Sequence, residues 1–284
     1  MAEVAGGELR KLTAFSSDPE GGNPAGVWIG GELPSDRVMQ EIAADVGFSE
    51  TAFLARTGHD GQWTTRYFAP ATEVTFCGHA TIASGVVLGD RFGDGKYQLV
   101  TVGGVVPVTV RTDGGIRIAS LTSVQPEHEP APEKLVHEAL HALGWDLDDL
   151  DDSIPPVRAF AGAWHLVLAV LSRQRLASLD YDFNRLKQTM TEDDLTTLQL
   201  IYRESRSLYH SRNPFPVGGV VEDPATGAAA AALGGYLRNA RLEDPPFAFT
   251  IRQGFDMGRP SVLSVEVPSS GGVVVSGPAV DLES

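Results

Sequence analysis

The alternation of apolar and polar positions along the chain predicts two similar halves, each with several strands and one buried helix. In the first half, residues 12–15, 25–29 and 64–68 have the apolar composition of strands and are bounded by turn residues. Residues 80–88 are rich in Ala, Val and Ile and carry no charge, as expected of a helix that is buried on every side. Residues 226–237 repeat this composition in the second half. We therefore expect two similar halves.

Further elements complete each half. A helix should begin at the cap Ser35, present Val38, Ile42 and Val46 on one face, and stop at Gly47. A second amphipathic helix is expected at residues 134–143. Further strands are expected at residues 51–54, 97–110, 116–121, 164–170, 198–203, 247–253, 261–267 and 271–275.

One segment, residues 125–133, has the composition of a linker, with three prolines and three acidic residues. We place the domain boundary there. The N-terminal domain is predicted to span residues 1–124, with a C-terminal strand at about 271–284 returning to it, and the C-terminal domain to span residues 125–270.

Charge and length exclude some classes of partner. The chain has 284 residues, 42% of them hydrophobic, and its 22 Lys and Arg against 37 Asp and Glu give a formal charge of -15. Such acidity disfavours nucleic acid and anionic membranes as partners. The single cysteine fits a reducing compartment, and residues 1–10 lack the apolar core of a signal peptide. We expect cytoplasmic residence.

Two segments, residues 73–81 and 221–227, share one layout. In each, an apolar strand ends at a reactive polar residue and a helix of small residues follows. A helix start exposes N–H groups and the positive end of the dipole, so two facing starts suit a small carboxylate. We expect the functional site in a cleft between the halves.

Three residues at these junctions, and Glu50 outside both of them, could carry chemistry. Cys77 at a helix start can be a nucleophile or a base, although a lone cysteine is more often a small buried hydrophobe. His79 could carry a proton or simply be a satisfied polar group. Glu50 stands before an apolar strand, where a partly dry cleft would suit general acid–base work, or it is a surface carboxylate. Asp223 is either catalytic or the N-cap of the Ala-rich helix.

A metal motif competes with these candidates. His137, Glu138 and His141 match the H-E-x-x-H pattern of zinc enzymes. The chain has Leu147 where a third ligand would be needed, and the helix's apolar face lies on the opposite side from the histidines. We therefore expect an ordinary half-exposed helix and no metal.

Six motifs follow one another along nearly the whole chain. They are Asn-Pro-Ala at 23–25, Gly-Phe-Ser-Glu-Thr-Ala-Phe at 47–53, Arg-Tyr-Phe-Ala-Pro at 66–70 leading to Glu-Val at 73–74, Cys-Gly-His-Ala-Thr at 77–81, Glu-Asp-Pro-Ala-Thr-Gly at 222–227, and Gln-Gly at 253–254 with Met-Gly-Arg-Pro-Ser at 257–261. Taken together and in this order, these motifs resemble those of the phenazine-biosynthesis PhzF-like family.

The resemblance implies an α+β fold like diaminopimelate epimerase. In that fold two similar domains each have a curved mixed or antiparallel sheet wrapped around a central helix, with the active site in the cleft between them. The family's members suggest a homodimer. The epimerase uses one cysteine from each domain, and here Cys77 is similar to the first while Asp223 stands at or beside the place of the second.

The resemblance also implies a reaction. Glu50 matches the glutamate that moves a proton within a small cyclic or unsaturated amino-acid-like carboxylate, such as 2,3-dihydro-3-hydroxyanthranilate, without cofactor or metal. His79 and Asp223 match residues that bind and polarise the substrate or assist the transfer. Substrate binding falls to six residues, which are Asn23, Cys77, Gly78, Thr226, Gly227 and Ala228. Ala228 replaces a serine of the phenazine enzyme, so the substrate can differ.

Two alternatives stay open at this point. Cys77 could serve an amino-acid epimerase or racemase, although the missing second thiol argues against a two-thiol mechanism. The chain could also be a non-catalytic member that binds a metabolite or a protein, because a fold alone does not fix function.

Overall fold

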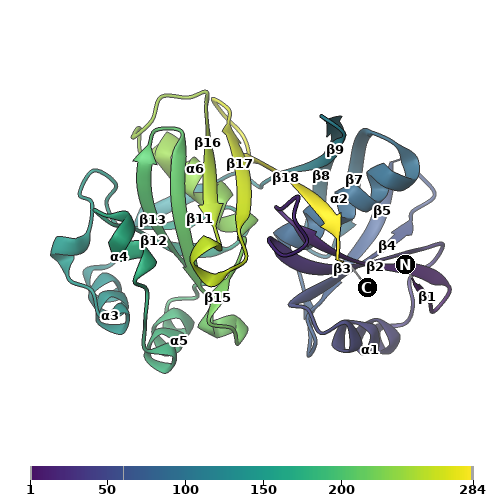
Figure 1. Cartoon of the computed structure of the whole chain (residues 1–284), viewed down its shortest axis with the longest axis horizontal. Coiled ribbons are helices and arrows are strands. Elements are labelled where there is room, and N and C mark those ends of the chain that lie inside the picture. Colours follow the sequence, from purple (N-terminus) through teal and green to yellow (C-terminus); the bar gives the residue numbers. More distant parts are fainter. Residues whose placement is uncertain (1, 60, 283–284) are drawn as a thin grey trace. The chain divides into compact units, whose positions relative to one another are not determined.

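The computed structural model describes residues 2–59 and 61–282, and the chain divides into two compact units (Figure 1). Unit 1 comprises Met1–Thr122 and Ser276–Ser284, and unit 2 comprises Ser123–Val275. Residues 283 and 284, the end of the predicted returning segment 271–284, lie outside the described residues. Each unit has its own core, so each is described separately.

Unit 1 is built on a mixed sheet with two helices. Its strands are β1 (Ala2–Val4), β2 (Gly7–Ala14), β3 (Asn23–Gly30), β4 (Glu50–Arg56), β5 (Gln62–Phe68), β6 (Glu73–Val74), β7 (Gly95–Thr101), β8 (Gly104–Asp113), β9 (Ile116–Thr122) and β18 (Val274–Asp281). The β3–β4 and β5–β7 pairs are parallel, whereas β2–β3, β4–β5, β7–β8 and β8–β9 are antiparallel. Strand β18 pairs with both β2 and β9, so the pairings close into a cycle.

Helix α2 (Gly78–Phe92) packs against β2, β3, β4, β8 and β9. Residues 79–89, about its first three turns, are buried, because apart from His79 they carry only small and apolar side chains with a few hydroxyls. Close approach to the sheet depends on Gly85, where an added Cβ would lie 2.7 Å from the Ala119 side chain and 2.9 Å from that of Val108. The small residues of this helix therefore serve packing.

Helix α1 (Asp36–Val46) covers the sheet with an apolar face that includes Met39, Ile42 and Val46, packed near Trp28 and Phe53. It begins after Ser35 and ends at Gly47, whose φ of 73° is the left-handed conformation that glycine adopts easily. The Ser35 side chain makes no capping hydrogen bond. The chain then turns through residues 48–49 into β4, which places Glu50 at the first position of that strand.

Unit 2 repeats the mixed-sheet plan with more helices. Its strands are β10 (Glu127–Pro130), β11 (Val157–Phe160), β12 (Trp164–Ala169), β13 (Thr197–Ser205), β14 (Leu208–Pro214), β15 (Glu222–Asp223), β16 (Phe247–Gln253) and β17 (Ser261–Val267). Its helices are α3 (Glu133–Leu143), α4 (Arg173–Ala177), α5 (Phe183–Glu192) and α6 (Gly227–Asn239), with short 3-10 turns at Leu147–Asp149, Pro216–Gly218 and Phe255–Met257. The β12–β13 and β14–β16 pairs are parallel.

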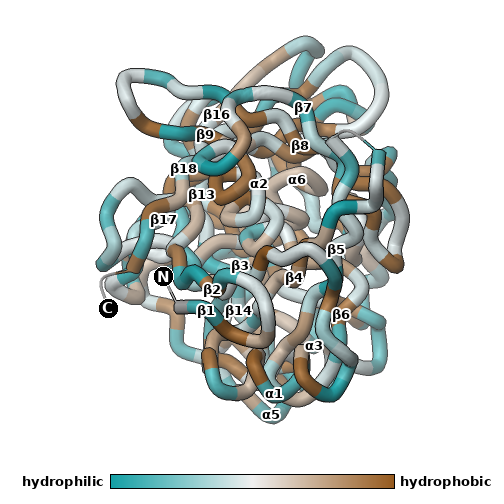
Figure 2. Tube along the Cα trace, turned by 90° about the vertical axis from the view of Figure 1, so that its right-hand side faces the viewer, coloured by the Kyte–Doolittle hydropathy of each residue, from teal (hydrophilic) through white to brown (hydrophobic). Residues whose placement is uncertain are grey.

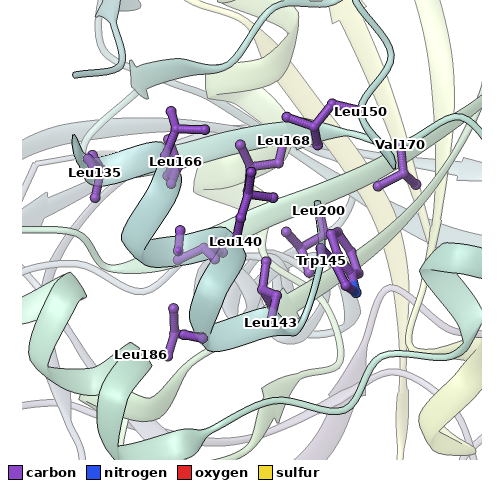
Figure 3. Packing of buried hydrophobic residues seen from close by; sticks show 14 of the residues in the cluster. Leu135, Leu140, Leu143, Trp145, Leu150, Leu166, Leu168, Val170, Leu186 and Leu200 are labelled. Atoms are coloured by element: carbon purple, nitrogen blue, oxygen red, sulfur yellow. The ribbon is translucent and has the colours of Figure 1, made fainter. Parts of the chain in front are cut away.

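The sheet of unit 2 is covered on both faces. Alternate residues of β12 and β13, including Leu168 and Leu200, pack with Leu140 and Leu143 of α3 and with Trp145 (Figure 3). Helix α6 packs against β10, β11, β12 and β17. Burying each leucine stabilises the fold by about 1.5–3 kcal/mol. Apolar stretches alternate with polar loop positions along the whole trace (Figure 2).

Two expectations from the sequence need correction. Residues 125–133 are not a simple linker, because Glu127–Pro130 form β10 and pair with β11. The last strand does not lie at residues 271–275 but runs over Val274–Asp281. The first expectation was wrong because it rested on proline content, and all three prolines lie at or outside the ends of the strand, where a missing N–H is tolerated. In the described part of the chain, no helix combines the length and apolarity that crossing a membrane requires.

Candidate functional site

The start of helix α2 positions Cys77 and His79. Short strand β6 ends at Val74, and Cys77 has extended backbone angles (φ -145°, ψ 116°) as the N-cap of the helix. The Thr81 hydroxyl donates to the Cys77 carbonyl oxygen at 2.7 Å and lies 2.7 Å from the Tyr67 hydroxyl. These buried contacts fix the helix start, so Cys77 and His79 are held on a rigid element.

Glu50 reaches the same place from the sheet. Strand β4 runs parallel to β3, with Glu50 opposite Ala25 in the register. Its Oε2 atom lies 3.5 Å from Cys77 Sγ and 3.4 Å from His79 Nε2. Cys77 Sγ also lies 3.4 Å from His79 Nδ1. The structure thus brings together Glu50, Cys77 and His79, and we call these three residues the Glu-Cys-His cluster.

The cluster is nearly dry. The side chains of His79 and Glu50 are 7% and 15% exposed, and Cys77 is buried. Burial lowers the pKa of His79, although the neighbouring Glu50 carboxylate and a hydrogen bond to the Pro24 backbone act in the opposite direction. His79 is therefore neutral at physiological pH, with one ring nitrogen protonated and the other a lone pair.

Two polar neighbours hold the histidine ring. Asn23, buried at the start of β3, places its side-chain amide nitrogen 3.2 Å from His79 Nδ1. The Ser49 hydroxyl lies 3.4 Å from His79 Nε2. The sequence predicted Asn23 as a substrate-binding residue, and the structure places it beside the histidine. Ser49 was not singled out, although its position next to Glu50 in the chain is a signal that could have found it.

The second junction, in unit 2, gathers different groups. Asp223 ends β15, and its Oδ2 atom accepts a hydrogen bond of 2.5 Å from the Thr226 hydroxyl. The buried Gln253 side chain donates to that hydroxyl at 2.9 Å and to the Asp223 carbonyl oxygen at 2.8 Å, while its own oxygen accepts from the Thr226 N–H at 3.2 Å. Asp223 is partly exposed and is not the N-cap, which is Thr226.

Gln253 is a site residue whose role the sequence did not indicate. It belongs to one of the six motifs of the resemblance, but that motif assigned it no contact. The following Gly254 has a φ of 78°. A Cβ there would lie 2.1 Å from the Arg259 carbonyl oxygen and 2.9 Å from that of Pro224. The backbone of Pro224, next to Asp223, therefore fits closely against the Gln-Gly turn, and only glycine permits this approach.

Glu222, beside Asp223, has a structural role. Its carboxylate is 3% exposed and receives two guanidinium nitrogens of Arg212, Nε at 3.0 Å and Nη2 at 2.5 Å. Arg212 also donates to the Ala177 carbonyl oxygen at 3.0 Å. This buried ion pair between Arg212 and Glu222 fixes β15 against β14. No sequence pattern predicted it.

The remaining predicted substrate-binding residues lie at the helix starts. Gly78 and Gly227 are the first residues of α2 and α6, and Ala228, partly exposed, follows in the first turn of α6. Neither N-cap side chain, Cys77 or Thr226, accepts a hydrogen bond from its own helix. Backbone N–H groups at such starts are the usual seat of small anions.

The H-E-x-x-H stretch has no part in either group. On α3 both His137 and His141 are exposed, and Glu138 pairs with Arg185 of α5 at 2.9 Å. The arginine lowers the pKa of Glu138 by hydrogen bonding and by its charge. Among the described residues, the group of His, Cys, Asp and Glu side chains that gathers donor atoms within 4.8 Å of one another is the Glu-Cys-His cluster.

Comparison with known proteins places the chain in a family. Residues 12–284 match the family model of the phenazine biosynthesis-like proteins, PhzC-PhzF. A relative from Bacillus subtilis named as an uncharacterized isomerase is 30% identical, covering 94% of this chain and 92% of the relative. The trans-2,3-dihydro-3-hydroxyanthranilate isomerase of Pseudomonas aeruginosa is 31% identical, covering 92% of this chain and 90% of the relative.

A solved structure agrees with the fold. The crystal structure of a PhzF-family phenazine biosynthesis protein from Bacillus anthracis superposes with a TM-score of 0.86 over 97% of this chain and 96% of that one, at 23% identity. Together with the family match over nearly the whole length and the isomerase names of the relatives, this shows that the chain is an enzyme belonging to the PhzC-PhzF family of phenazine biosynthesis-like isomerases.

Proposed function

We propose that this isomerase moves a proton within a small cyclic or unsaturated amino-acid-like carboxylate, of the type of 2,3-dihydro-3-hydroxyanthranilate, with Glu50 as the proton carrier. The observation that carries the proposal is the position of the Glu50 carboxylate, which is only 15% exposed and lies 3.4 Å from His79 Nε2. A relative named for such an isomerisation is 31% identical over most of its length.

In the proposed reaction Glu50 acts first as base and then as acid. Its carboxylate takes a proton from a substrate carbon, and the C–H electron pair enters the neighbouring double bond, which shifts by one position. The carboxylic acid then returns the proton to the carbon at the far end of the shifted π-system. Atoms and charge balance without an oxidant or a reductant, so the step needs no redox partner.

His79 is proposed to assist this transfer. A neutral imidazole next to the carboxylate donates or accepts a hydrogen bond without competing as a cation for the proton. Burial and the contact with Asn23 hold the ring in place, so its orientation is set before substrate arrives. Asp223, fixed by the Thr226 hydroxyl and partly exposed, is proposed to contact and polarise substrate.

The binding of the substrate carboxylate is assigned to backbone N–H groups at the helix starts near Gly78 and Gly227. Each helix begins with a glycine, so no side chain covers the backbone of its first residue. Ala228 has no hydroxyl, whereas the phenazine enzyme has a serine at this position. We therefore propose that the natural substrate of this enzyme differs from that of the phenazine enzyme in the group that would contact residue 228.

The test uses trans-2,3-dihydro-3-hydroxyanthranilate and related unsaturated cyclic amino acids in heavy water, with proton NMR to follow deuterium entering carbon-bound positions. The wild type is expected to exchange, and Glu50→Gln to lose exchange by about 10²–10⁴-fold while staying folded. Glu32→Gln, at an exposed position, is the matched control. Full exchange in Glu50→Gln would refute the role of this residue.

A second candidate function rests on Cys77, whose Sγ atom lies 3.4 Å from His79 Nδ1 and 3.5 Å from Glu50 Oε2. A thiolate here could remove the α-proton of an amino acid, as in an epimerase. The chain has one cysteine, so a mechanism with a thiol on each face of the substrate is closed to it. Normal turnover in Cys77→Ser would eliminate this candidate, whereas inversion of an amino-acid α-carbon that disappears in that variant would establish it.

A further inference from the structure

We propose that unit 1 has a second binding site, remote from the Glu-Cys-His cluster, for an amino acid that carries an aromatic side chain and is bound as a zwitterion. The site is a cavity of about 620 Å³, which we call the Arg56 pocket. The side chains of its lining that carry the argument are Arg56, Arg91, Trp63, Phe92, Glu3 and Glu8. Binding here does not depend on the proton-carrier role proposed for Glu50.

The Arg56 pocket lies at the opposite end of the elements that carry the cluster. Strand β4 begins at Glu50 and ends at Arg56. Helix α2 follows Cys77 and ends at Phe92. A helix of its 15 residues is about 22 Å long. A ligand in this pocket is therefore well separated from the groups proposed to move protons.

Two aromatic rings hold the Arg56 guanidinium in place. Arg56 and Trp63 are partners in the β4–β5 register, and the guanidinium carbon lies 5.4 Å from the Trp63 ring centre. It lies 4.6 Å from the ring centre of Phe92, which reaches the same place from the end of α2. The two ring centres are 5.2 Å apart. Cation–π contacts of this kind position an arginine while its N–H groups stay available for a ligand.

The Arg56 guanidinium has no carboxylate partner among residues 2–59 and 61–282. Arg66 on β5 provides the contrast, because its guanidinium carbon also lies near a ring, 5.1 Å from the ring centre of Phe68. The N–H groups of Arg66 pair with the carboxylates of Glu73 and Asp36. A guanidinium presents its donors in a fork that fits both oxygens of one carboxylate. The contrast favours an external carboxylate as the partner of Arg56.

The pocket also has groups that can receive an ammonium. Glu8 Oε2 lies 3.5 Å from Arg91 Nη1, and both side chains are partly exposed. A charge-assisted hydrogen bond usually spans about 2.7–2.9 Å, so this ion pair is loose. Glu3, which is exposed, lines the same pocket. The two carboxylates can therefore accept hydrogen bonds from an ammonium group of a ligand.

The charges of the lining select among ligand classes. Among its described residues, two arginines and two glutamates carry charge. A dianion such as a phosphate ester would be repelled by the two carboxylates, and a simple amine by the two guanidinium groups. A zwitterion offers an opposite charge to each pair.

An apolar wall accommodates the rest of the ligand. The rings of Trp63 and Phe92 and the side chain of Ile29 line the pocket. Phe92 is 41% exposed, so part of its ring is free to contact a ligand. A Cβ placed on Gly6 or Gly31, which also line the pocket, would have no atom within 4 Å, so the space beside these glycines is open. An aromatic side chain fits this combination of apolar wall and open space.

The direct test measures the binding of three probes to the purified full chain by calorimetry. L-phenylalanine carries both charged groups, 3-phenylpropionate lacks the ammonium group, and phenethylamine lacks the carboxylate. We expect L-phenylalanine to saturate one site, and each of the other two probes to bind at least about 10-fold more weakly, because each leaves a charged partner without its hydrogen bonds. Equal affinity for either truncated probe, or no saturable binding of L-phenylalanine at millimolar concentration, would overturn the proposal.

Variants locate the carboxylate end of the ligand. Arg56→Gln should weaken L-phenylalanine binding by about 10–100-fold, because a charge-assisted pair is lost. Phe92→Ala keeps every charge but removes one ring from Arg56, so binding should weaken by about 2–5-fold. Arg37→Gln, an exposed position of α1 in the same unit, is the matched control for the loss of one positive charge and should keep the affinity. Wild-type affinity in Arg56→Gln would overturn the proposal.

A double variant locates the ammonium end. Glu3→Gln combined with Glu8→Gln removes both carboxylates of the pocket, so the preference for L-phenylalanine over 3-phenylpropionate should disappear. A preference that survives in this double variant would refute the zwitterion as the ligand class.

Two further measurements separate the Arg56 pocket from the Glu-Cys-His cluster. Glu50→Gln should keep the affinity for L-phenylalanine, whereas binding that is lost in Glu50→Gln and kept in Arg56→Gln would place the ligand at the cluster and overturn the proposal. In NMR spectra, the indole N–H signal of Trp63, identified by its absence in Trp63→Phe, should shift on saturation. The signals of Trp145 and Trp164, which belong to unit 2, should stay in place. An unchanged Trp63 signal at saturation would likewise contradict binding in this pocket.

Discussion

The two strand-to-helix junctions of this protein share a backbone plan but use it differently. At the start of α2, three side chains of different chemistry, Glu50, Cys77 and His79, converge within 3.4–3.7 Å. At the start of α6, one carboxylate, Asp223, is held by the neutral groups of Thr226 and Gln253. The shared strand-to-helix backbone therefore does not determine which side chains gather at the helix start or what chemistry they can perform.

The difference has a physical origin in what lies next to each junction. In unit 1 the parallel pair β3–β4 begins beside the start of α2, so Asn23 and Glu50 reach it. In unit 2 the neighbouring strand β14 instead carries Arg212, which neutralises Glu222. The first junction therefore has three groups able to exchange protons, whereas at the second the buried Glu222 carboxylate is held by Arg212.

The largest expected effect concerns the Arg212–Glu222 pair. Replacing Arg212 by Met leaves the Glu222 carboxylate buried without its partner, which should destabilise the protein by about 3–5 kcal/mol. The measurement is the free energy of unfolding by urea at neutral pH. Arg175→Met, which removes a more exposed pair with Asp149, is the matched control and should cost no more than about 1 kcal/mol. Equal losses would show that the second junction does not depend on its buried pair.

The next effect concerns His165, fully buried on β12 and 2.8 Å from the Thr197 hydroxyl. Desolvation lowers its pKa to about 3, below the 6.5 of an exposed histidine. Below pH 6.5 the unfolded chain binds a proton that the folded chain refuses, so stability is present above that pH and falls toward pH 3. Lowering the pH from about 7.5 to about 5 should cost about 2 kcal/mol from this residue.

The contribution of His165 is isolated by difference. Urea unfolding of the wild type and of His165→Gln at both pH values separates this histidine from every other titrating group. If the variant lost as much unfolding free energy as the wild type between the two pH values, His165 would have to be as readily protonated in the folded chain as in the unfolded one.

A smaller effect is expected at Thr226. Thr226→Val keeps the shape but removes the hydroxyl that donates to Asp223 and accepts from Gln253. The free energy of unfolding should fall by about 1–2 kcal/mol, because the Asp223 carboxylate and the Gln253 amide each lose a hydrogen bond. Thr191→Val, whose hydroxyl bonds only within the exposed face of α5, is the control for the substitution itself and should change stability by less. A loss at Thr226 no larger than that of the control would contradict the proposed support of Asp223.

Much of this structure could be predicted from the sequence. The late strands at residues 247–253 and 261–267 were predicted with their observed ends, because apolar runs flanked by Pro and Gly leave little choice. Helices α2 and α6 were expected from their lack of charge. Strands β10 and β11 were missed, since they are short and one of them lies between prolines.

The site could be predicted in part. Motif resemblance singled out Glu50, Cys77, His79 and Asn23, which the structure brings together in unit 1. The contacts themselves could not be predicted, because they depend on a parallel register that sets β4 beside β3. Gln253 and Arg212 were missed as supporting residues for a similar reason: each acts across strands far apart in the chain, and tertiary packing leaves no periodic trace in the sequence.

The central claim is that proton chemistry resides at the first junction and that the second supports it. Its most direct test compares the rates of solvent-deuterium exchange into substrate for Glu50→Gln and Asp223→Asn under identical conditions. The account predicts a fall of about 10²–10⁴-fold for Glu50→Gln and a distinctly smaller fall for Asp223→Asn. Exchange that survives in Glu50→Gln but vanishes in Asp223→Asn would contradict it.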